Sequence, residues 1–112
     1  MGLLTPNPPP WHPVIKQLKG VMGEVLSTAS QWEGGLPNLA LGYTLRRAEL
    51  ATDIPTVVGF STPKEVHECV AVWRELQSKQ QDVGRRRLEE LVRLKFREHG
   101  WENRAWVSPP PE

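Results

Sequence analysis

The chain has 112 residues and a formal net charge of +1, which suit one small domain and imply no general attraction to nucleic acid or to an anionic membrane. A single cysteine, Cys69, excludes an internal disulfide framework and a cysteine-rich metal site. No apolar run approaches membrane-spanning length, and the N-terminus lacks the basic-then-apolar pattern of a secretory signal, so a cytoplasmic protein is expected.

Prolines gather at both ends of the chain, at Pro6, 8–10 and 109–111, so we expect loops there. Between them, apolar residues at helical spacing predict a helix over 14–32. A second helix is predicted over 36–48 and is apolar around most of its circumference, which suggests packing against a sheet. Arg46 and Arg47 near its end suit the helix dipole and are expected to face solvent.

A short apolar, β-branched run over 54–58 has the composition of a strand covered on both faces, as in parallel sheets. A lone strand leaves backbone N–H and C=O groups without partners. We therefore expect an α/β fold in which the neighbouring strands come from a larger parallel sheet or from an oligomer.

The stretch Thr62-Pro63-Lys64-Glu65 has the spacing of a capping box, with Thr62 at the N-cap, Pro63 at the first helical position and Glu65 reaching back to the cap. The helix after it is expected to bury one apolar face. That face comprises Val66, Cys69, Val70, Trp73 and Leu76. The turn over 59–62 points free N–H groups and the positive end of the helix dipole past the strand, which fits either a phosphate site or a simple helix cap.

A last helix is predicted over 85–99, and Gly100 is placed to end it. The run Arg85, Arg86 and Arg87 at its start suggests nucleic-acid binding. Nearby glutamates offset this charge, so a solvated helix face and no nucleic-acid partner are expected. Trp101 and Trp106 either fold back onto apolar surface or cover a partner.

Three stretches of the sequence resemble one family. GFSTPKEVHECVAVWREL resembles the last strand, phosphate loop and last barrel helix of the aldo/keto reductases. GLLTPNPPPWHP and WEGGLPNLALGYTLRR resemble the branch with the fungal NAD-dependent D-arabinose 1-dehydrogenases and the plant L-galactose dehydrogenases. The resemblance implies that residues 1–77 are the C-terminal fragment of a (β/α)8 TIM barrel, mostly helical on its own. It implies that residues 78–112 are a helical extension with a proline-rich tail, and that the chain begins inside the length of a full relative.

By the same resemblance, Gly59, Phe60, Ser61 and Thr62 match the loop that wraps the adenosine end of a nicotinamide dinucleotide. Glu68 matches an acidic residue that hydrogen-bonds the adenine.

Two departures from the family pattern bear on the cofactor. Cys69 stands where an asparagine that contacts the adenine is common, which puts that contact in doubt. Gly59 and Glu65 stand where NADP-dependent relatives carry basic residues. A carboxylate repels a 2′-phosphate and tolerates a 2′-hydroxyl, so NAD is expected in preference to NADP.

The resemblance implies a full-length enzyme that oxidises an aldose such as D-arabinose to its lactone by hydride transfer, with a dinucleotide and a sugar as its partners. The family's catalytic Asp, Tyr, Lys and His have no match here, and Tyr43 falls in an outer helix, so no catalytic residue is assigned. We expect the isolated chain to be inactive, with a complementing barrel fragment or self-association completing the sheet. The alternative is a non-enzymatic helical interaction module derived from a barrel.

Overall fold

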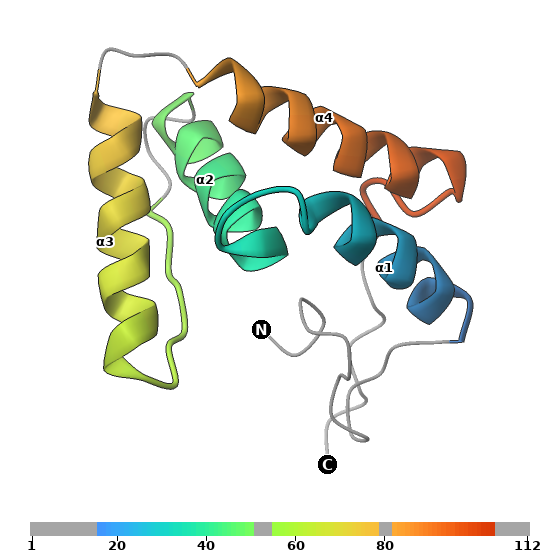
Figure 1. Ribbon diagram of the computed structural model, residues 1–112, viewed down its shortest axis with the longest axis horizontal. Coiled ribbons are helices and arrows are strands. Elements are labelled where there is room, and N and C mark those ends of the chain that lie inside the picture. Colours follow the sequence, from blue (N-terminus) through green and yellow to red (C-terminus); the bar gives the residue numbers. More distant parts are fainter. Residues whose placement is uncertain (1–15, 51–54, 79–81, 105–112) are drawn as a thin grey trace.

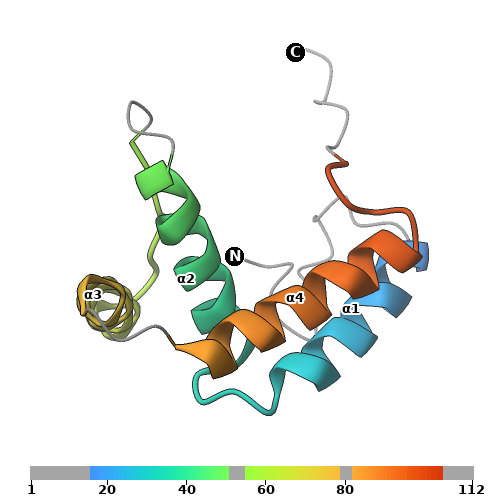
Figure 2. The same cartoon turned by 90° about the horizontal axis from the view of Figure 1, so that it is seen from above.

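The computed structural model describes residues 16–50, 55–78 and 82–104, which form four α-helices (Figure 1). In chain order these are α1 (Lys16–Ala29), α2 (Gly35–Leu50), α3 (Pro63–Gln77) and α4 (Val83–Glu98). α2 is central because it packs against each of the other three, while α1 and α4 run side by side (Figure 2). α3 packs mainly on α2, on the side away from α1. Across the described ranges, no helix is both long enough and apolar enough to span a bilayer.

The core lies where α1, α2 and α4 meet. The buried side chains of α1 recur at helical spacing, and all are at most 5% exposed. They are Leu18, Val21, Met22, Val25 and Ala29. Leu36 and Leu39 of α2 complete the buried cluster, against which Val92 and Phe96 of α4 pack. The one-sided apolar patterns predicted for α1 and α4 are therefore confirmed within the described residues. The expectation that α2 packs against a sheet is wrong, because the described elements packed against it are all helices.

The predicted α/β barrel-fragment fold is wrong for the described residues, because all four elements are helices and none is a strand. The predicted strand over 54–58 is described from residue 55 onward, where it is irregular chain that joins no sheet. Neighbouring elements cover little of this apolar segment, and Val57 is 93% exposed. A strand needs a neighbouring strand to pair its backbone N–H and C=O groups. No such neighbour is present among the described residues, so strand-like composition alone does not make residues 55–58 a strand.

The buried face of α3 also differs from the prediction. Val72 is 1% exposed, and Cys69 and Leu76, on the same side, are half-buried. The other apolar residues expected in the core stay 40–45% exposed. They are Val66, Val70 and Trp73. One neighbouring helix covers one side of α3, so a broad apolar face is only partly buried.

The start of α3 follows the predicted capping box closely. Thr62 is the N-cap, and its Oγ1 accepts a hydrogen bond from the N–H of Glu65 at 3.3 Å. The Glu65 carboxylate reaches back, but it accepts from the N–H of Ser61 at 2.6 Å, one residue before the cap. The predicted cap at Thr62 is therefore confirmed, and the return bond of the capping box is shifted by one residue, from the N–H of Thr62 to that of Ser61.

The end of α4 is set by Gly100, as predicted. Its φ of +74° is the left-handed conformation that favours glycine. The N–H of Gly100 donates to the carbonyl of Arg97, and the N–H of Trp101 donates to that of Phe96. This is a Schellman arrangement, and it turns Trp101 back onto the core. Trp106 lies outside the described residues.

A close approach between α2 and α4 generates the first testable prediction. Gly42 is buried in α2, and a Cβ at that position would overlap Nη1 of Arg85 and lie 3.0 Å from its Cζ. Overpacking costs about 1–3 kcal/mol, while alanine gains roughly 1 kcal/mol of helix propensity over glycine. We expect Gly42→Ala to lower the free energy of unfolding in urea by about 1 kcal/mol net.

Gly23 in α1 is the matched control, since nothing lies within 4 Å of a Cβ placed there. Gly23→Ala should raise the free energy of unfolding by up to about 1 kcal/mol. Equal effects of the two substitutions would contradict the contact between Gly42 and Arg85.

Candidate functional site

Arg85 is the most buried charged residue in the described part of the chain, with 2% of its surface exposed. It lies in the first turn of α4, where its N–H donates to the Asp82 N-cap carboxylate at 2.9 Å. The prediction that all three arginines of this run lie on a solvated face is therefore wrong for Arg85. It is confirmed for Arg86 and Arg87, which are exposed.

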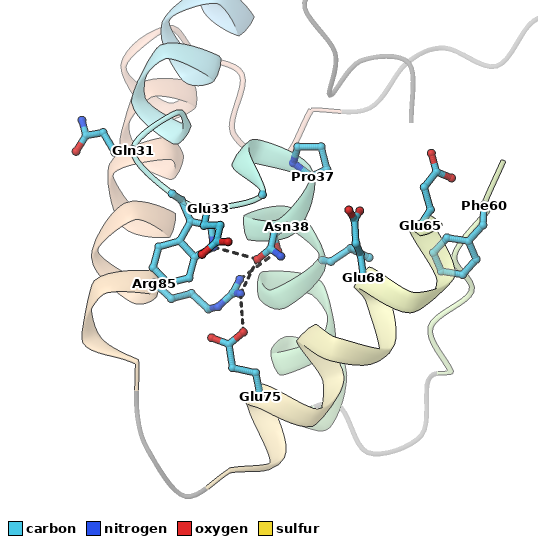
Figure 3. A pocket seen from close by; sticks show the side chains of 12 residues that line it. Gln31, Glu33, Pro37, Asn38, Phe60, Glu65, Glu68, Glu75 and Arg85 are labelled. Carbon is cyan, nitrogen blue, oxygen red and sulfur yellow. Dashed lines mark hydrogen bonds and ion pairs between the residues drawn. The ribbon is translucent and has the colours of Figure 1, made fainter. Parts of the chain in front are cut away.

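The guanidinium of Arg85 contacts residues from three other parts of the fold (Figure 3). Nη1 donates to the backbone carbonyl of Asn38 at 3.1 Å, and Nη2 donates to its Oδ1 at 2.6 Å. Nη2 also lies 3.3 Å from the carboxylate of Glu75 on α3. Cζ lies 4.9 Å from the ring centroid of Trp32, whose indole N–H donates to the same Asn38 Oδ1 at 3.0 Å. Arg85 thus ties α4 to α2, α3 and the loop after α1.

A groove of about 750 Å³ opens beside this cluster, between α2, α3 and the loop after α1. Two aromatic side chains, Trp32 and Phe60, line it. Its acidic side chains are Glu33, Glu65, Glu68 and Glu75. In Figure 3, Phe60 and Glu65 lie at the end where α3 begins, and Glu75 and Arg85 lie toward the other end.

The lining of the groove is negatively charged. Arg85 supplies its cation, and that charge is already paired with Glu75. The Glu68 carboxylate lies 3.9 Å from Lys64 in an exposed pair, which contributes little. A diphosphate entering this groove would therefore meet carboxylates and no free cation among the lining residues.

The structure brings together some of the residues predicted to hold a cofactor. Phe60, Glu65 and Glu68 line the groove. Cys69 is half-buried and does not line it. The others, all exposed on the segment that leads into α3, are Gly59, Ser61 and Thr62.

Backbone donors at the start of α3 are used by the chain itself. The N–H of Ser61 donates to Glu65, and the N–H of Glu65 donates to Thr62. These are groups that a phosphate at this helix end would need. A phosphate would therefore have to displace the Glu65 carboxylate, whereas a simple helix cap needs no change.

Sequence reasoning missed the groove residues Trp32, Asn38, Glu75 and Arg85. A signal for Arg85 was present, because it precedes Leu88 and Val92 by three and seven residues and so shares their apolar face. The charge of the three consecutive arginines favoured a solvated helix face instead.

Arg46 also departs from its predicted place in solvent. Its side chain is 25% exposed, and Nη2 lies 2.5 Å from the nearly buried carboxylate of Glu89. Arg47, its neighbour, is exposed as predicted.

Titration and metal binding add little to this site. A hydrogen bond to Glu90, with the charges of Glu90 and Glu102, raises the pKa of Arg93, which keeps that guanidinium cationic. Among residues 16–50, 55–78 and 82–104, no cluster of His, Cys, Asp and Glu is suited to hold a metal ion.

This chain has a distant relative among characterised enzymes. It is 35% identical over 79 residues to L-galactose dehydrogenase of Arabidopsis thaliana, a match that covers 70% of this chain and 24% of that protein. The chain thus spans about a quarter of the length of the relative it matches. No family model matches the sequence, and no solved structure matches it. The match establishes a distant relationship to this dehydrogenase.

The Arg85 cluster generates the second prediction. In Arg85→Lys, one ammonium cannot hold Asn38 and Glu75 together and also stack on Trp32. We expect a loss of about 1–3 kcal/mol in the free energy of unfolding, the usual effect of leaving buried polar groups unpaired.

Arg86→Lys is the matched control at the next, exposed position, where the change should stay within about 0.5 kcal/mol. Denaturant midpoints for both variants give the comparison. If Arg85→Lys were as stable as Arg86→Lys, the buried cluster would not be holding the helices together.

Proposed function

We propose that this chain forms the adenosine-side, C-terminal portion of a nicotinamide-dependent aldose dehydrogenase of the aldo/keto reductase type. The observation that carries the proposal is the 35% identity over 79 residues to L-galactose dehydrogenase. In this proposal residues 1–77 are the barrel portion and residues 78–112 are an extension. α4 belongs to that extension and packs on α1 and α2, so it would cover the outside of the barrel portion.

The groove fits one half of a dinucleotide better than the other. Phe60 offers an aromatic face for an adenine, and the Glu68 carboxylate can accept from its amino group. Ribose hydroxyls can likewise donate to a carboxylate such as Glu65. The diphosphate does not fit the groove as it stands, because it finds no unpaired cation among the lining residues and the Ser61 N–H is occupied.

The chemistry of hydride transfer is not expected from this chain alone. The residues that line the groove include no Tyr, Lys or His able to exchange a proton with a sugar hydroxyl. Transfer also needs donor and acceptor held in near-attack geometry, which one open groove does not enforce. The substrate proposed for the longer enzyme is an aldose such as L-galactose or D-arabinose, oxidised to its lactone.

A second candidate function is supported by one specific feature, the exposed apolar face of α3. Val66, Val70 and Trp73 follow one another along this helix and are 40–45% exposed. A non-enzymatic interaction module derived from a barrel would cover this face with a partner protein, whereas the barrel fragment would cover it by self-association or with a complementing barrel fragment. Sedimentation, thermal unfolding and adenosine titration of the isolated chain together separate the candidates. A monomer that unfolds cooperatively and binds no adenosine nucleotide would favour the module, and a self-associating chain that binds adenosine would favour the barrel fragment.

Cofactor choice supplies the third prediction. The Glu65 carboxylate would repel a 2′-phosphate, so we expect NAD to bind about ten-fold more tightly than NADP. Calorimetry with NAD, NADP and adenosine on the purified chain measures this ratio, and adenosine should bind at least as well as NAD because it lacks the diphosphate.

Glu65→Gln tests the cause of that ratio, since it removes the charge and keeps the size. The preference for NAD should shrink in this variant and persist in Glu98→Gln, an exposed control at the end of α4. Tighter binding of NADP than of NAD to the unchanged protein would refute the proposed preference.

Lack of turnover is the fourth prediction. With L-galactose or D-arabinose and NAD, the chain should produce NADH no faster than buffer. The reason is that no Tyr, Lys or His that could take the proton of the sugar hydroxyl lines the groove. L-galactose dehydrogenase in the same assay is the positive control. Sustained NADH production by the purified chain would overturn the prediction of inactivity.

A further inference from the structure

A second cavity, of about 230 Å³, lies between α1, α2 and α4 and shares no lining residue with the acidic groove. We propose that the side chain of Trp106, from the segment of this chain that follows the described residues, docks into this cavity. The inference does not rest on the function proposed above, because it uses neither the acidic groove nor the relationship to L-galactose dehydrogenase.

The walls that the cavity offers to an occupant are mainly apolar and come from all three helices. The apolar lining residues are Met22, Leu36, Leu39, Ala40, Val92 and Phe96. An occupant therefore gains chiefly by burying apolar surface of its own.

The charged side chains at the cavity are already paired with other residues of the chain. Glu89 lines the cavity and lies 2.5 Å from Arg46. Arg93 also lines it and is paired with Glu90 and Glu102, at 3.0 and 3.3 Å. The oxygens of Glu89 and Nε of Arg93 make no hydrogen bond, but each has less than 1 Å² of accessible surface, so an occupant cannot reach them. A charged occupant would lose its hydration without gaining a partner, which favours a neutral one.

The size of the cavity suits an indole. An apolar cavity of about 150 Å³ is enough to bind benzene, so a cavity of about 230 Å³ has room for a second, fused ring. A buried indole also needs an acceptor for its N–H group. Tyr43 and Thr44 line the cavity, and the hydroxyl group of either can accept that hydrogen bond.

The described chain ends beside this cavity. The carboxylate of Glu102 lies 3.3 Å from Nη1 of Arg93, a lining residue. The turn at Gly100 brings Trp101 back onto the core, and the guanidinium carbon of Arg104 lies 5.2 Å from the centroid of the Trp101 ring. In Figure 2, this last part of the described chain rises from α4 on the same side as α2. The chain is therefore directed toward the space between α2 and α4.

Trp106 is within reach of the cavity. It follows Glu102 by four residues, which span at most about 14 Å when extended. Residues 105–107 are Ala, Trp and Val, a neutral and apolar stretch of the kind that the cavity walls favour. A group tethered at this distance has an effective concentration in the millimolar range, so it fills even a weak site ahead of a dilute solute.

Trp11, from the other end of the chain, is the competing occupant. The described chain begins at Lys16, which is six residues, or about 9 Å along the helix axis, from Met22, the α1 residue that lines the cavity. Glu102, in contrast, contacts a lining residue directly. The C-terminal segment is therefore favoured over the N-terminal one.

The first experiment measures which indoles are shielded from solvent. The full chain is labelled with 5-fluorotryptophan, and its five ¹⁹F signals are assigned by single Trp→Phe substitutions. A soluble paramagnetic agent then broadens the signals of exposed rings. Trp101, packed on the core, and Trp73, 45% exposed, are the internal references. The Trp106 signal should broaden no more than that of Trp101, and the Trp11 signal at least as much as that of Trp73.

Two variants localise the shielding. Ala40→Leu fills part of the cavity and should make the Trp106 signal broaden like that of Trp73. Ala71→Leu, at an exposed position of α3, is the matched control and should leave the Trp106 signal shielded.

The second experiment replaces the tethered side chain with free indole and does not depend on the folding of Ala40→Leu. Indole should bind Trp106→Ala at least about ten-fold more tightly than the unchanged chain, in which the tethered ring competes for the cavity. Trp11→Ala is the matched control and should bind indole as weakly as the unchanged chain. In ¹⁵N-labelled Trp106→Ala, the shifts on adding indole should concentrate at Ala40, Tyr43 and Val92.

Three results would each overturn the proposal. The first is broadening of the Trp106 signal to the level of Trp73, and the second is shielding of Trp11 in its place. The third is equal affinity of indole for Trp106→Ala and the unchanged chain, including no binding to either.

Discussion

The buried guanidinium of Arg85 is the interaction on which the arrangement of the helices depends. α3 packs mainly on α2, and α4 begins beside both, so a charge at this junction can reach all of them. Burying an arginine is unfavourable unless its donors are satisfied. Here Asn38 supplies two acceptors, Glu75 supplies a third, and Trp32 covers the face of the guanidinium, while the buried Nε finds no acceptor among the described residues. Gly42 leaves the space that this side chain occupies.

The same cluster determines the electrostatic character of the neighbouring groove. Because Arg85 is committed to Asn38 and Glu75, it does not offset the charge of Glu33, Glu65 or Glu68. A groove with aromatic walls and carboxylates suits a nucleoside better than a diphosphate. The geometry of the groove therefore favours the adenosine half of the dinucleotide over its diphosphate in the function proposed above.

α3 is the least covered helix. It carries Glu65, Glu68 and Cys69, and the other residues that the resemblance assigns to the adenosine end precede it at 59–62. Its apolar side chains exceed what α2 alone can bury, so Val66, Val70 and Trp73 remain open to solvent. The segment before it has strand-like composition and no strand to join in the described structure. Both features are accounted for if further protein packs here, as either proposed function requires.

The sequence by itself determined the features that depend on residues close along the chain. The helical periods of α1 and α4, the presence of a helix at α2, the Thr62 cap and the Gly100 stop were all predicted, because each rests on residues within one or two helical turns. Only the tertiary structure decided which charged residues are buried, which side of α3 is covered, and that the chain after residue 54 joins no described strand. Those outcomes depend on partners far away in sequence. Asn38 and Arg85, for example, are 47 residues apart, and no local pattern specifies that they meet.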